Sequence, residues 1–403
     1  MTWWHRAGDL LAVVLTWLGV AARIPSKAPG PHPVSSVMHR IPGASGTLAQ
    51  VFYPADGRTK QAARRAYVRS GVVAGVAHFA LTPRVLLNGA LGRAPHPLAE
   101  SGAPLPRPAG EPKHPVVIFL HGLGGNCEIY SAVCSFIASH GYVVVALESE
   151  DGSGSFAVTE EGGVLMYRRP PTGMAYTHEN VASFRRPFLE TRAKEVARAV
   201  EYLRGGEAAS ATGVVADVLG ECDVDRVFLA GHSFGGASAA FAARRLPAGT
   251  FRGVLLHDVW PFPLPDDVLD AGVPCPTLSL LSEPFLESHE AAYTQRLLAN
   301  TERSAGYVVR GSIHQSFSDS PWWVGITSLA KKFELRTDED PLPIMTDIVA
   351  ASVAFLDAFA AGRSPSTVAA AVDAAGVKRL RRCHGADAVS TAGAAVDDAL
   401  AVQ

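Results

Sequence analysis

The chain has 403 residues, of which 48% are hydrophobic and 18% are charged. This composition excludes wholesale disorder and is sufficient to form a large buried core. The 36 lysine and arginine residues nearly balance the 38 aspartate and glutamate residues, so the charge gives no reason to expect a nucleic-acid partner.

Residues 1–23 form an apolar N-terminal segment. Leu10–Ala22 is apolar apart from Thr16, and a run of this length is too short to cross a bilayer. Its length suits the hydrophobic part of a signal peptide, or an interfacial or core-packing helix. Asp9, directly before the run, is unusual for a signal peptide. We therefore expect a cytoplasmic or membrane-associated protein, with secretion as the alternative.

Two stretches in the first quarter of the chain are expected to form secondary structure. Residues 46–54 (GTLAQVFYP) alternate enough for an early antiparallel strand. Residues 71–91 are strongly apolar and indicate two helical pieces, because Thr82 can cap a helix that begins at Pro83. Residues 94–113 are rich in proline and predict a surface loop.

From residue 114 onward, short β-branched runs alternate with helical stretches. The runs are apolar throughout, as expected for strands buried on both faces of a parallel sheet: 116–120, 142–147, 226–231, 253–258, 277–281 and 307–310. Helices are expected between them, at 190–203 and 235–245. This alternation predicts an α/β domain with a mostly parallel central sheet flanked by helices, which we place at residues 24–361. Residues 362–403 are predicted to be an alanine-rich tail, either a peripheral helix or a flexible end.

A serine lies where one of these strands gives way to a helix. The motif Gly231-His232-Ser233-Phe234-Gly235 directly follows the strand RVFLA and leads into an alanine-rich helix. A serine on such a sharp strand-to-helix turn has its hydroxyl exposed above the sheet, and the flanking residues must be small to avoid a clash. The pattern therefore predicts Ser233 as a nucleophile, whereas the alternative is a glycine-rich packing turn.

A serine nucleophile requires a base, because its hydroxyl is a poor nucleophile at its ordinary pKa. In the α/β-hydrolase fold the partners follow in the order Ser, Asp or Glu, His. His314 lies just past the strand-like GYVVR, and we predict that it is the base. The alternatives are His257, His289 and His384, of which His289 lies in a polar stretch and His257 is expected to point away from its neighbour Asp258.

Asp258 closes the strand GVLLHD and begins a proline-rich loop. Strand ends of an open α/β sheet are where catalytic groups gather, and an aspartate there can fix the tautomer of the histidine. We therefore predict Asp258 as the third catalytic residue. Asp266 and Asp267, further along the loop, remain alternatives.

Two backbone N–H groups are expected to stabilise the developing oxyanion. One is that of Phe234, after the nucleophile, and the other that of Leu123, in the HGLGG turn after the strand VVIFL. His121, directly before this turn, is interpreted as a structural residue.

No metal or cofactor is expected. The sequence contains neither a GxxxxGK[ST] loop nor an HExxH motif, and its five cysteines show no metal-ligand spacing.

Several segments resemble the platelet-activating factor acetylhydrolases, from about residue 24 to residue 359. The segments are VFYPADG, HPVVIFLHGLGG, YSAVCSFIASHGYVVVALESEDGSGS, GHSFGG, HDVWPFPL and RGSIHQSFSD. By position, the resemblance implies Ser233, Asp258 and His314 as the triad, and Leu123 and Phe234 as oxyanion donors. It also implies a calcium-independent esterase that hydrolyses short or oxidised sn-2 acyl groups of glycerophospholipids.

The chain departs from this family in one segment near the site. Where mammalian members have a basic His-Arg-Asp segment, this sequence has Ser149-Glu150-Asp151-Gly152, so headgroup recognition is expected to differ. Residues 71–91 match the region of a lipid-surface helix in the plasma enzyme, which implies peripheral association with a lipid surface. The alternative is that this stretch caps the core.

Three competing functions remain open from the sequence. A carboxylesterase or lipase for non-phospholipid esters would use the same triad. An inactive lipid-binding relative would be expected to lack a triad residue, and acyl transfer to an alcohol would share the acyl-enzyme.

Overall fold

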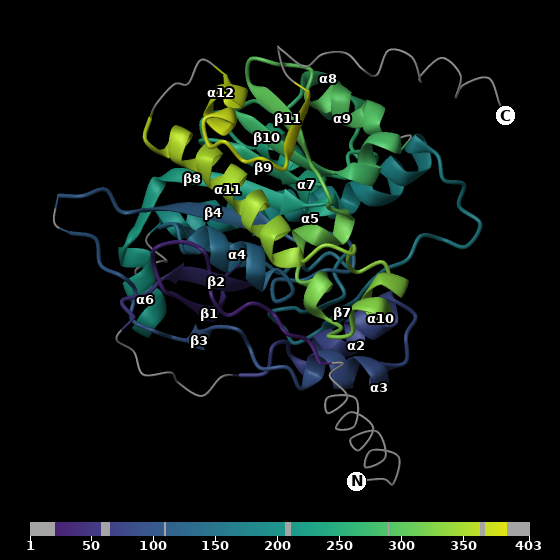
Figure 1. The fold of residues 1–403 in the computed structure, drawn as a ribbon, viewed down its shortest axis with the longest axis horizontal. Helices are drawn as coiled ribbons and strands as arrows, with labels where there is room; N and C mark the ends of the chain where they lie inside the picture. Colours follow the sequence, from purple (N-terminus) through teal and green to yellow (C-terminus); the bar gives the residue numbers. More distant parts are fainter. Residues whose placement is uncertain are drawn as a thin grey trace, which may run out of the picture.

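The computed structural model describes residues 21–57, 65–108, 110–205, 211–288, 290–362 and 367–384. The predicted N-terminal apolar segment therefore lies almost entirely outside the described residues. Within them, the main sheet has ten strands in the order β12-β11-β10-β9-β8-β4-β5-β2-β1-β3 (Figure 1).

The centre of the sheet is parallel, as the sequence predicts, and each predicted run forms a strand. Neighbours from β11 to β5 pair in parallel: β4 (His114–Leu120), β5 (Val143–Leu147), β8 (Cys222–His232), β9 (Val254–His257), β10 (Thr277–Ser282) and β11 (Ser304–Val309). The predicted early antiparallel strand is β2 (Leu48–Pro54), which pairs with β5 and with β1 (Val34–Arg40). A two-residue strand, β3 (Ala99–Glu100), adds to β1, and β6 (Phe156–Val158) and β7 (Val164–Met166) form a separate hairpin.

Helices cover both faces of the sheet, because the central strands carry apolar residues on both faces. Along β4, Val117 and Phe119 join the core beneath α4 (Ser131–Ala138) and α11 (Pro341–Ala360). Val116 and Ile118 join the core beneath α5 (His178–Arg204) and α7 (Phe234–Arg245). The remaining helices lie around these layers: α2 (Ser70–Phe79), α3 (Arg84–Leu87), η1 (Asn88–Gly92), α6 (Gly213–Gly220), α8 (Asp266–Ala271), η3 (Glu283–Glu287), α9 (Ala291–Leu297), η4 (His314–Phe317), η5 (Ser320–Trp322), α10 (Thr327–Lys332) and α12 (Val368–Asp373).

One described helix, α11, is long and apolar enough to cross a membrane by length and composition alone. Half of that stretch is buried within the protein, where Ile344, Ile348 and Phe355 belong to the core. Such burial is typical of the central helix of a folded domain.

The two helical pieces predicted at residues 71–91 are α2 and α3, but the predicted cap is wrong. Pro83, not Thr82, is the N-cap residue of α3, and the Thr82 hydroxyl donates to the carbonyl oxygen of Ala80 instead. Leu81 has a positive φ of 51°, which turns the chain between the two helices. This turn places Thr82 one residue too early to cap α3.

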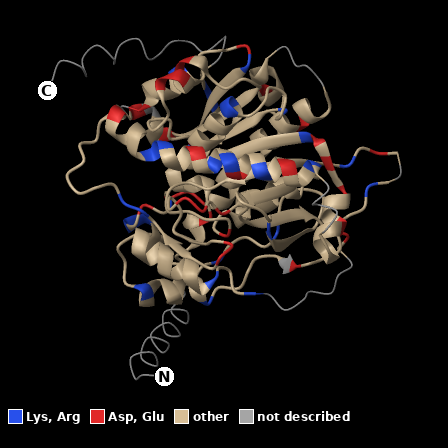
Figure 2. Cartoon of the chain, turned by 180° about the vertical axis from the view of Figure 1, so that it is seen from behind, with Lys and Arg blue, Asp and Glu red and all other residues tan. Residues whose placement is uncertain are grey.

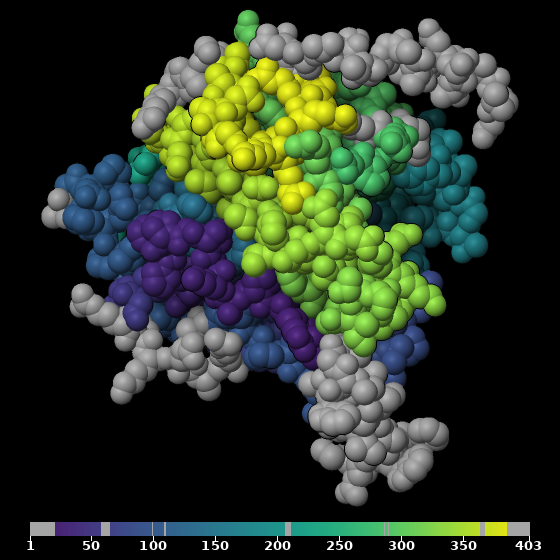
Figure 3. All heavy atoms as spheres, in the orientation of Figure 1, coloured from purple at the N-terminus to yellow at the C-terminus, as the bar shows by residue number. Residues whose placement is uncertain are grey.

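Part of the predicted C-terminal tail belongs to the sheet. Residues 367–384 include α12, which packs on α11 and β11, and β12 (Leu380–His384), which pairs antiparallel with β11. Figure 3 shows these yellow residues covering one end of the molecule, beside the green segments. The sheet thus extends beyond the boundary at residue 361, which the change in composition had suggested.

Candidate active site

Ser233 lies on the turn between β8 and α7 in a strained backbone conformation. Its φ is 57° and its ψ is −123°, a region that residues with a side chain rarely adopt and that typically costs about 1–3 kcal/mol. The turn is tight: a Cβ atom on Gly231 would clash with the backbone of Gly235, and one on Gly235 would clash with the Leu120 carbonyl. The glycines that the motif supplies are therefore required by the packing.

Asp258 and His314 are joined directly. His314 Nδ1 lies 2.7 Å from Asp258 Oδ2, which fixes the histidine tautomer with its proton on Nδ1 and leaves Nε2 available as a base. The Asp258 carboxylate also accepts the N–H of Ser282 at 2.7 Å and its hydroxyl at 2.8 Å. Asp258 is buried, whereas the side chain of His314 is 44% exposed. A buried, hydrogen-bonded carboxylate thus orients an imidazole that solvent and substrate can reach.

All three predicted triad residues line one cavity of about 390 Å³. Its wall consists of residues from five loops or turns: Leu123, Ser233, Asp258, Trp260, Ser282, Pro284, Phe285, Ser288, Glu290 and His314. Within the described residues, no hydrogen bond joins the Ser233 hydroxyl to His314. Catalytic hydrogen bonds often tighten only in the substrate complex, so this arrangement is compatible with proton transfer.

The two predicted oxyanion amides lie at the same place. Leu123 lines the cavity, and Phe234 is the first residue of α7, directly after Ser233. Neither backbone N–H donates a hydrogen bond to any described residue. A Cβ atom on Gly122 would come within 3.0 Å of the Ser233 Cβ, so the HGLGG turn passes directly beside the serine.

Two of the three alternative histidines form hydrogen bonds away from the cavity. His257 is buried, and its Nε2 lies 2.9 Å from the hydroxyl of Ser352 on α11. His384 lies on β12 and contacts the Leu298 carbonyl. His289 lies outside the described residues.

The alternative carboxylates are on the surface of α8. Asp266 is bonded to Arg296 at 2.9 Å and Asp267 to Arg245 at 3.1 Å. Neither lines the cavity that holds Ser233, so the geometry favours Asp258.

His121 is a buried structural residue, as its position before the turn predicts. The Ser149 N–H donates to its Nε2 at 3.1 Å, so its proton lies on Nδ1, which is 2.8 Å from the Gly122 carbonyl. Burial, reinforced by nearby Arg192, holds the pKa of His121 well below its usual value.

Arg192, on α5, is a supporting residue that the sequence pattern does not reveal. It is fully buried, pairs with Asp151 at 3.0 Å, and donates to the His121 carbonyl at 2.6 Å and the Ser153 hydroxyl at 2.7 Å. Its guanidinium lies 4.8 Å from the centre of the Phe234 ring. One buried cation therefore ties the HGLGG turn to the loop after β5 and to the start of α7.

Asp319, five residues after the proposed base, is a second residue of this kind. Its carboxylate accepts the N–H groups of Ser131 and Ala132 and the Tyr67 hydroxyl, each at 2.8 Å. Burial raises the pKa of Asp319 to about 6, although these hydrogen bonds oppose the shift. Asp319 thus caps α4 and anchors the loop that carries His314. It lies within the segment GSIHQSFSD, but only the fold shows its partners.

Trp260, two residues after Asp258 in the chain, lines the cavity. Phe262 instead stacks on Tyr176 with ring centres 5.1 Å apart, and Trp323 donates to the hydroxyl of Tyr67. The aromatic residues around the triad thus divide between the cavity wall and its supporting core.

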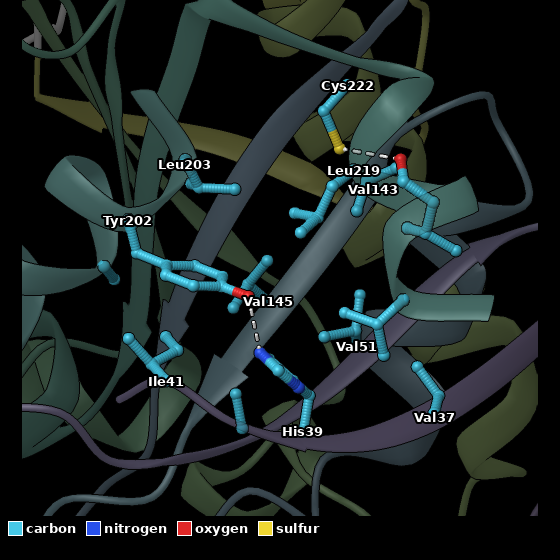
Figure 4. Close-up of a pocket in the computed structure, with 14 residues that line it drawn as sticks. Val37, His39, Ile41, Val51, Val143, Val145, Tyr202, Leu203, Leu219 and Cys222 are labelled. Atoms are coloured by element: carbon cyan, nitrogen blue, oxygen red, sulfur yellow. Dashed lines mark hydrogen bonds between the residues drawn. The ribbon is translucent and has the colours of Figure 1, made fainter. Parts of the chain in front are cut away.

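A second cavity lies far from these residues, between the sheet and α6 (Figure 4). It is lined by apolar side chains around the hydrogen-bonded pair His39 and Tyr202, which are 2.9 Å apart. The volume of this cavity is about 20 Å³, roughly enough for one water molecule. This gap offers no room for a substrate.

No group of three or more His, Cys, Asp or Glu residues arranged to hold a metal occurs in the part of the chain that the structure describes. The functional groups of the site are a serine hydroxyl, an imidazole, a carboxylate and two backbone amides. Together they can carry out acyl transfer through a covalent intermediate.

Comparison with known proteins places this chain in a family. The sequence model of the family described as platelet-activating factor acetylhydrolase, isoform II, matches residues 21–362. The platelet-activating factor acetylhydrolase of Gallus gallus is 29% identical over 267 residues, which cover 60% of this chain and 61% of that protein. The enzyme of Bos taurus is 30% identical over 256 residues, which cover 60% of this chain and 56% of that protein. The chain thus matches about three fifths of the length of these curated relatives.

A solved structure shares the fold. The ferulic acid esterase from Streptomyces cinnamoneus aligns with a TM-score of 0.63 and 17% identity, covering 91% of this chain and all of that one. At this identity the likeness concerns the α/β-hydrolase fold, which confirms the fold predicted from the sequence.

Proposed function

Because the chain belongs to the platelet-activating factor acetylhydrolase isoform II family, we propose that it hydrolyses the short or oxidised sn-2 acyl group of glycerophospholipids. Ser233 is the nucleophile, His314 the general base and Asp258 the residue that orients the base. The observation that carries this proposal is the hydrogen bond of 2.7 Å between His314 and Asp258 at the wall of the cavity that also holds Ser233.

The reaction follows from these positions. His314 Nε2 accepts the Ser233 proton as the hydroxyl oxygen attacks the ester carbonyl, and Asp258 stabilises the imidazolium that forms. The N–H groups of Leu123 and Phe234 bind the oxyanion. His314 then donates its proton to the departing glycerol oxygen, which leaves an acyl group on Ser233. Water, activated by the same histidine, attacks this ester and releases the carboxylic acid.

The size of the cavity supports a short acyl group. At about 390 Å³ it lies near the lower end of the range for small-molecule sites, and Leu123, Trp260 and Phe285 form apolar walls. Each extra methylene gains about 0.8 kcal/mol where there is space. Once the space is filled, overpacking costs about 1–3 kcal/mol.

A substrate panel tests this function. The specificity constant is measured for phosphocholine lipids that carry acetyl to palmitoyl at sn-2, beside short nitrophenyl esters and a triglyceride. We expect acetyl and other short chains to be cleaved fastest. A rate that rises steadily with chain length would indicate a general lipase or phospholipase. Turnover of the nitrophenyl esters alone would indicate a carboxylesterase.

The acidic segment after β5 does not oppose a phospholipid substrate. Asp151 is fully buried and paired with Arg192, and Glu150 is paired with Arg40 at 2.7 Å. Neither residue lines the cavity. The acidic side chains that replace the basic segment therefore serve internal ion pairs, and headgroup contacts must come from other residues.

A second part of the proposal is contact of α2 and α3 with the lipid surface. Leu81 is 79% exposed and Leu86 is 42% exposed, next to the exposed Arg84. In Figure 2, which shows the molecule from behind, this corner beside the N-terminal trace is mostly tan with blue basic positions. The Phe79 ring packs directly against Gly124 of the HGLGG turn, so the end of α2 lies beside the oxyanion loop, two residues before Leu81. Insertion of Leu81 and Leu86 would therefore bring a lipid ester toward Ser233.

Vesicle binding tests this part. Replacing Leu81 and Leu86 together by serine is expected to weaken sedimentation with phosphatidylcholine vesicles at least about tenfold, because burial of a leucine gains about 1.5–3 kcal/mol. Activity on a soluble nitrophenyl ester should remain. The matched control is Leu342→Ser, at another exposed leucine on α11. Equal binding by all three proteins would contradict a docking role for these leucines.

A further inference from the structure

Three consecutive hydrogen bonds connect separate parts of the site. The Gly122 N–H donates to the Tyr130 hydroxyl oxygen at 3.0 Å, this oxygen lies 2.9 Å from His232 Nδ1, and His232 Nε2 lies 3.0 Å from the His314 carbonyl oxygen. Tyr130 and His232 are each 3% exposed. The three hydrogen bonds therefore lie in the protein interior, where water does not compete for their donors and acceptors.

For a neutral His232 ring, only one placement of protons satisfies all three bonds. Because the Gly122 N–H can only donate, the Tyr130 oxygen accepts from it and gives its own proton to His232 Nδ1. Because a carbonyl oxygen can only accept, His232 Nε2 must carry the ring proton that it donates to His314. A neutral His232 therefore carries its proton on Nε2. Burial, together with the neighbouring His314 and His257, holds the pKa of His232 well below its usual value and agrees with the neutral ring.

The ends of this chain are the groups that must be aligned for catalysis. Gly122 directly precedes Leu123, whose amide is a proposed oxyanion donor, and His232 directly precedes Ser233. The far end is the backbone of His314 itself. The rings of His232 and His314 are also packed, with centres 4.5 Å apart. One side-chain pair thus fixes the oxyanion turn, the nucleophile and the base relative to one another.

We propose that Tyr130 and His232 are positioning residues for acyl transfer at Ser233. This inference rests on the proposed function, since it assigns roles around the same nucleophile. Neither side chain lines the substrate cavity. Their loss therefore lowers the rate of the chemical step, and leaves ground-state binding of the substrate nearly unchanged.

The test compares two tyrosine-to-phenylalanine variants. Tyr130→Phe removes the central hydroxyl of the chain. Tyr142→Phe removes the hydroxyl of another buried tyrosine, which is bonded to Asp357 on the side of the molecule where the strands of the parallel sheet begin. With the sn-2 acetyl substrate, Tyr130→Phe is expected to lower kcat about 10- to 100-fold, with KM within about twofold, because small misplacements at a site cost rates of this order. Tyr142→Phe should retain the kcat of the unaltered protein.

A second pair of variants tests the hydrogen bond between His232 and the His314 carbonyl. His232→Gln can still donate an amide N–H to the His314 carbonyl, whereas His232→Ala cannot, so kcat should be higher for the glutamine variant. Nitrogen NMR of His232 should show the neutral Nε2–H tautomer in both the unaltered protein and Tyr130→Phe, with the chemical shift of Nδ1 changed in Tyr130→Phe because this nitrogen loses its hydrogen bond.

These outcomes separate the positioning role from the function. Equal kcat losses in Tyr130→Phe and Tyr142→Phe, a loss confined to KM, or equal rates for His232→Gln and His232→Ala would overturn the proposal. Failure of the unaltered protein to cleave the acetyl lipid would overturn the proposed substrate instead. In that case the same comparison uses the rate at which an organophosphate labels Ser233, which needs no substrate.

Discussion

Two residues of the proposed triad have left-handed backbones although neither is glycine. Ser233 has a φ of 57° and Asp258 a φ of 41°. Aspartate tolerates this region better than most residues, and the Asp258 carboxylate is held in place by the N–H of Ser282 at the end of β10. The Ser233 N–H donates to the His257 carbonyl at 3.0 Å, and the close packing of the glycines around Ser233 maintains its strained conformation. Both conformations direct a side chain away from the sheet and into the cavity.

The triad assignment predicts non-additive losses. His314→Ala and Asp258→Asn are each expected to lower kcat at least about 10³-fold, and the double variant should lose little more than the worse single one, since these residues act as a unit. The measurement is kcat for all three proteins and for Asp266→Asn, a control on α8 that should keep full activity. Additive losses would show that one residue acts outside the triad. Damage by Asp266→Asn would show that the carboxylate was misassigned.

His257, a buried histidine outside the triad, is expected to make the free energy of unfolding depend on pH. Burial lowers the pKa of His257 to about 4, and the nearby Asp258 only partly offsets this. The unfolded chain then binds the proton more tightly than the folded one. The free energy of unfolding is therefore expected to fall as the pH drops from about 6.5 to about 4, by up to about 3 kcal/mol from this group.

Urea unfolding at a series of pH values measures this contribution. His257→Gln should retain a donor to Ser352 and show a correspondingly shallower decline between these pH values. His121 and His232 remain in both proteins, so the difference between the two curves isolates His257. Parallel curves would mean that His257 does not stay neutral in the folded state.

At the scale of elements, the sequence predicts central strands better than edge strands. The six runs of the parallel centre are apolar on both sides, because helices cover both faces, and this pattern is visible in the sequence alone. β1 (VSSVMHR) and β12 (LRRCH) carry polar and basic residues instead. Strands near a sheet edge contact solvent, so their residues do not show a buried pattern. Their pairing depends on partners far away in the chain.

The C-terminal elements predict a stability effect. Val368 and Val372 of α12 are 1% and 0% exposed, and the Tyr307 hydroxyl of β11 donates to Asp373 at 2.7 Å. Ending the chain after residue 362 should therefore lower the free energy of unfolding by at least about 3 kcal/mol, from loss of two buried valines. Ending it after residue 384 keeps these contacts, so this protein should be the more stable of the two. Equal stability of the two truncated proteins in urea would show that α12 and β12 add nothing.

At the scale of the whole molecule, segments far apart in the sequence pack side by side. The N–H of Arg23 donates to the Trp322 carbonyl at 2.9 Å, and Figure 3 shows the purple N-terminal residues beside the light green segment near residue 330. Chain order and strand ends were enough to predict that the proposed triad and Leu123 come together, but not that residues 282–290 complete the cavity wall. Tyr130, Arg192 and Asp319 could not be predicted in this way, because their roles arise from contacts between distant segments. Nothing in the residues next to them in the chain marks those contacts.

The site as a whole predicts catalysis without a metal ion. A serine, a histidine and two amides supply the nucleophile, the proton transfer and the oxyanion stabilisation. Excess chelator should therefore leave the hydrolysis rate unchanged at saturating acetyl lipid. Loss of activity that calcium restores would contradict this mechanism.

The central claim is that hydrolysis of an sn-2 acetyl phospholipid proceeds through Ser233, and its most direct test is titration with a serine-directed organophosphate. Mass spectrometry locates and counts the label while the remaining acetyl-lipid hydrolysis is measured on the same samples. We predict one label per chain, on the peptide that carries Ser233, with activity falling in proportion to the labelled fraction and no label on Ser233→Ala. Full hydrolysis by a fully labelled protein, or by Ser233→Ala, would contradict the account.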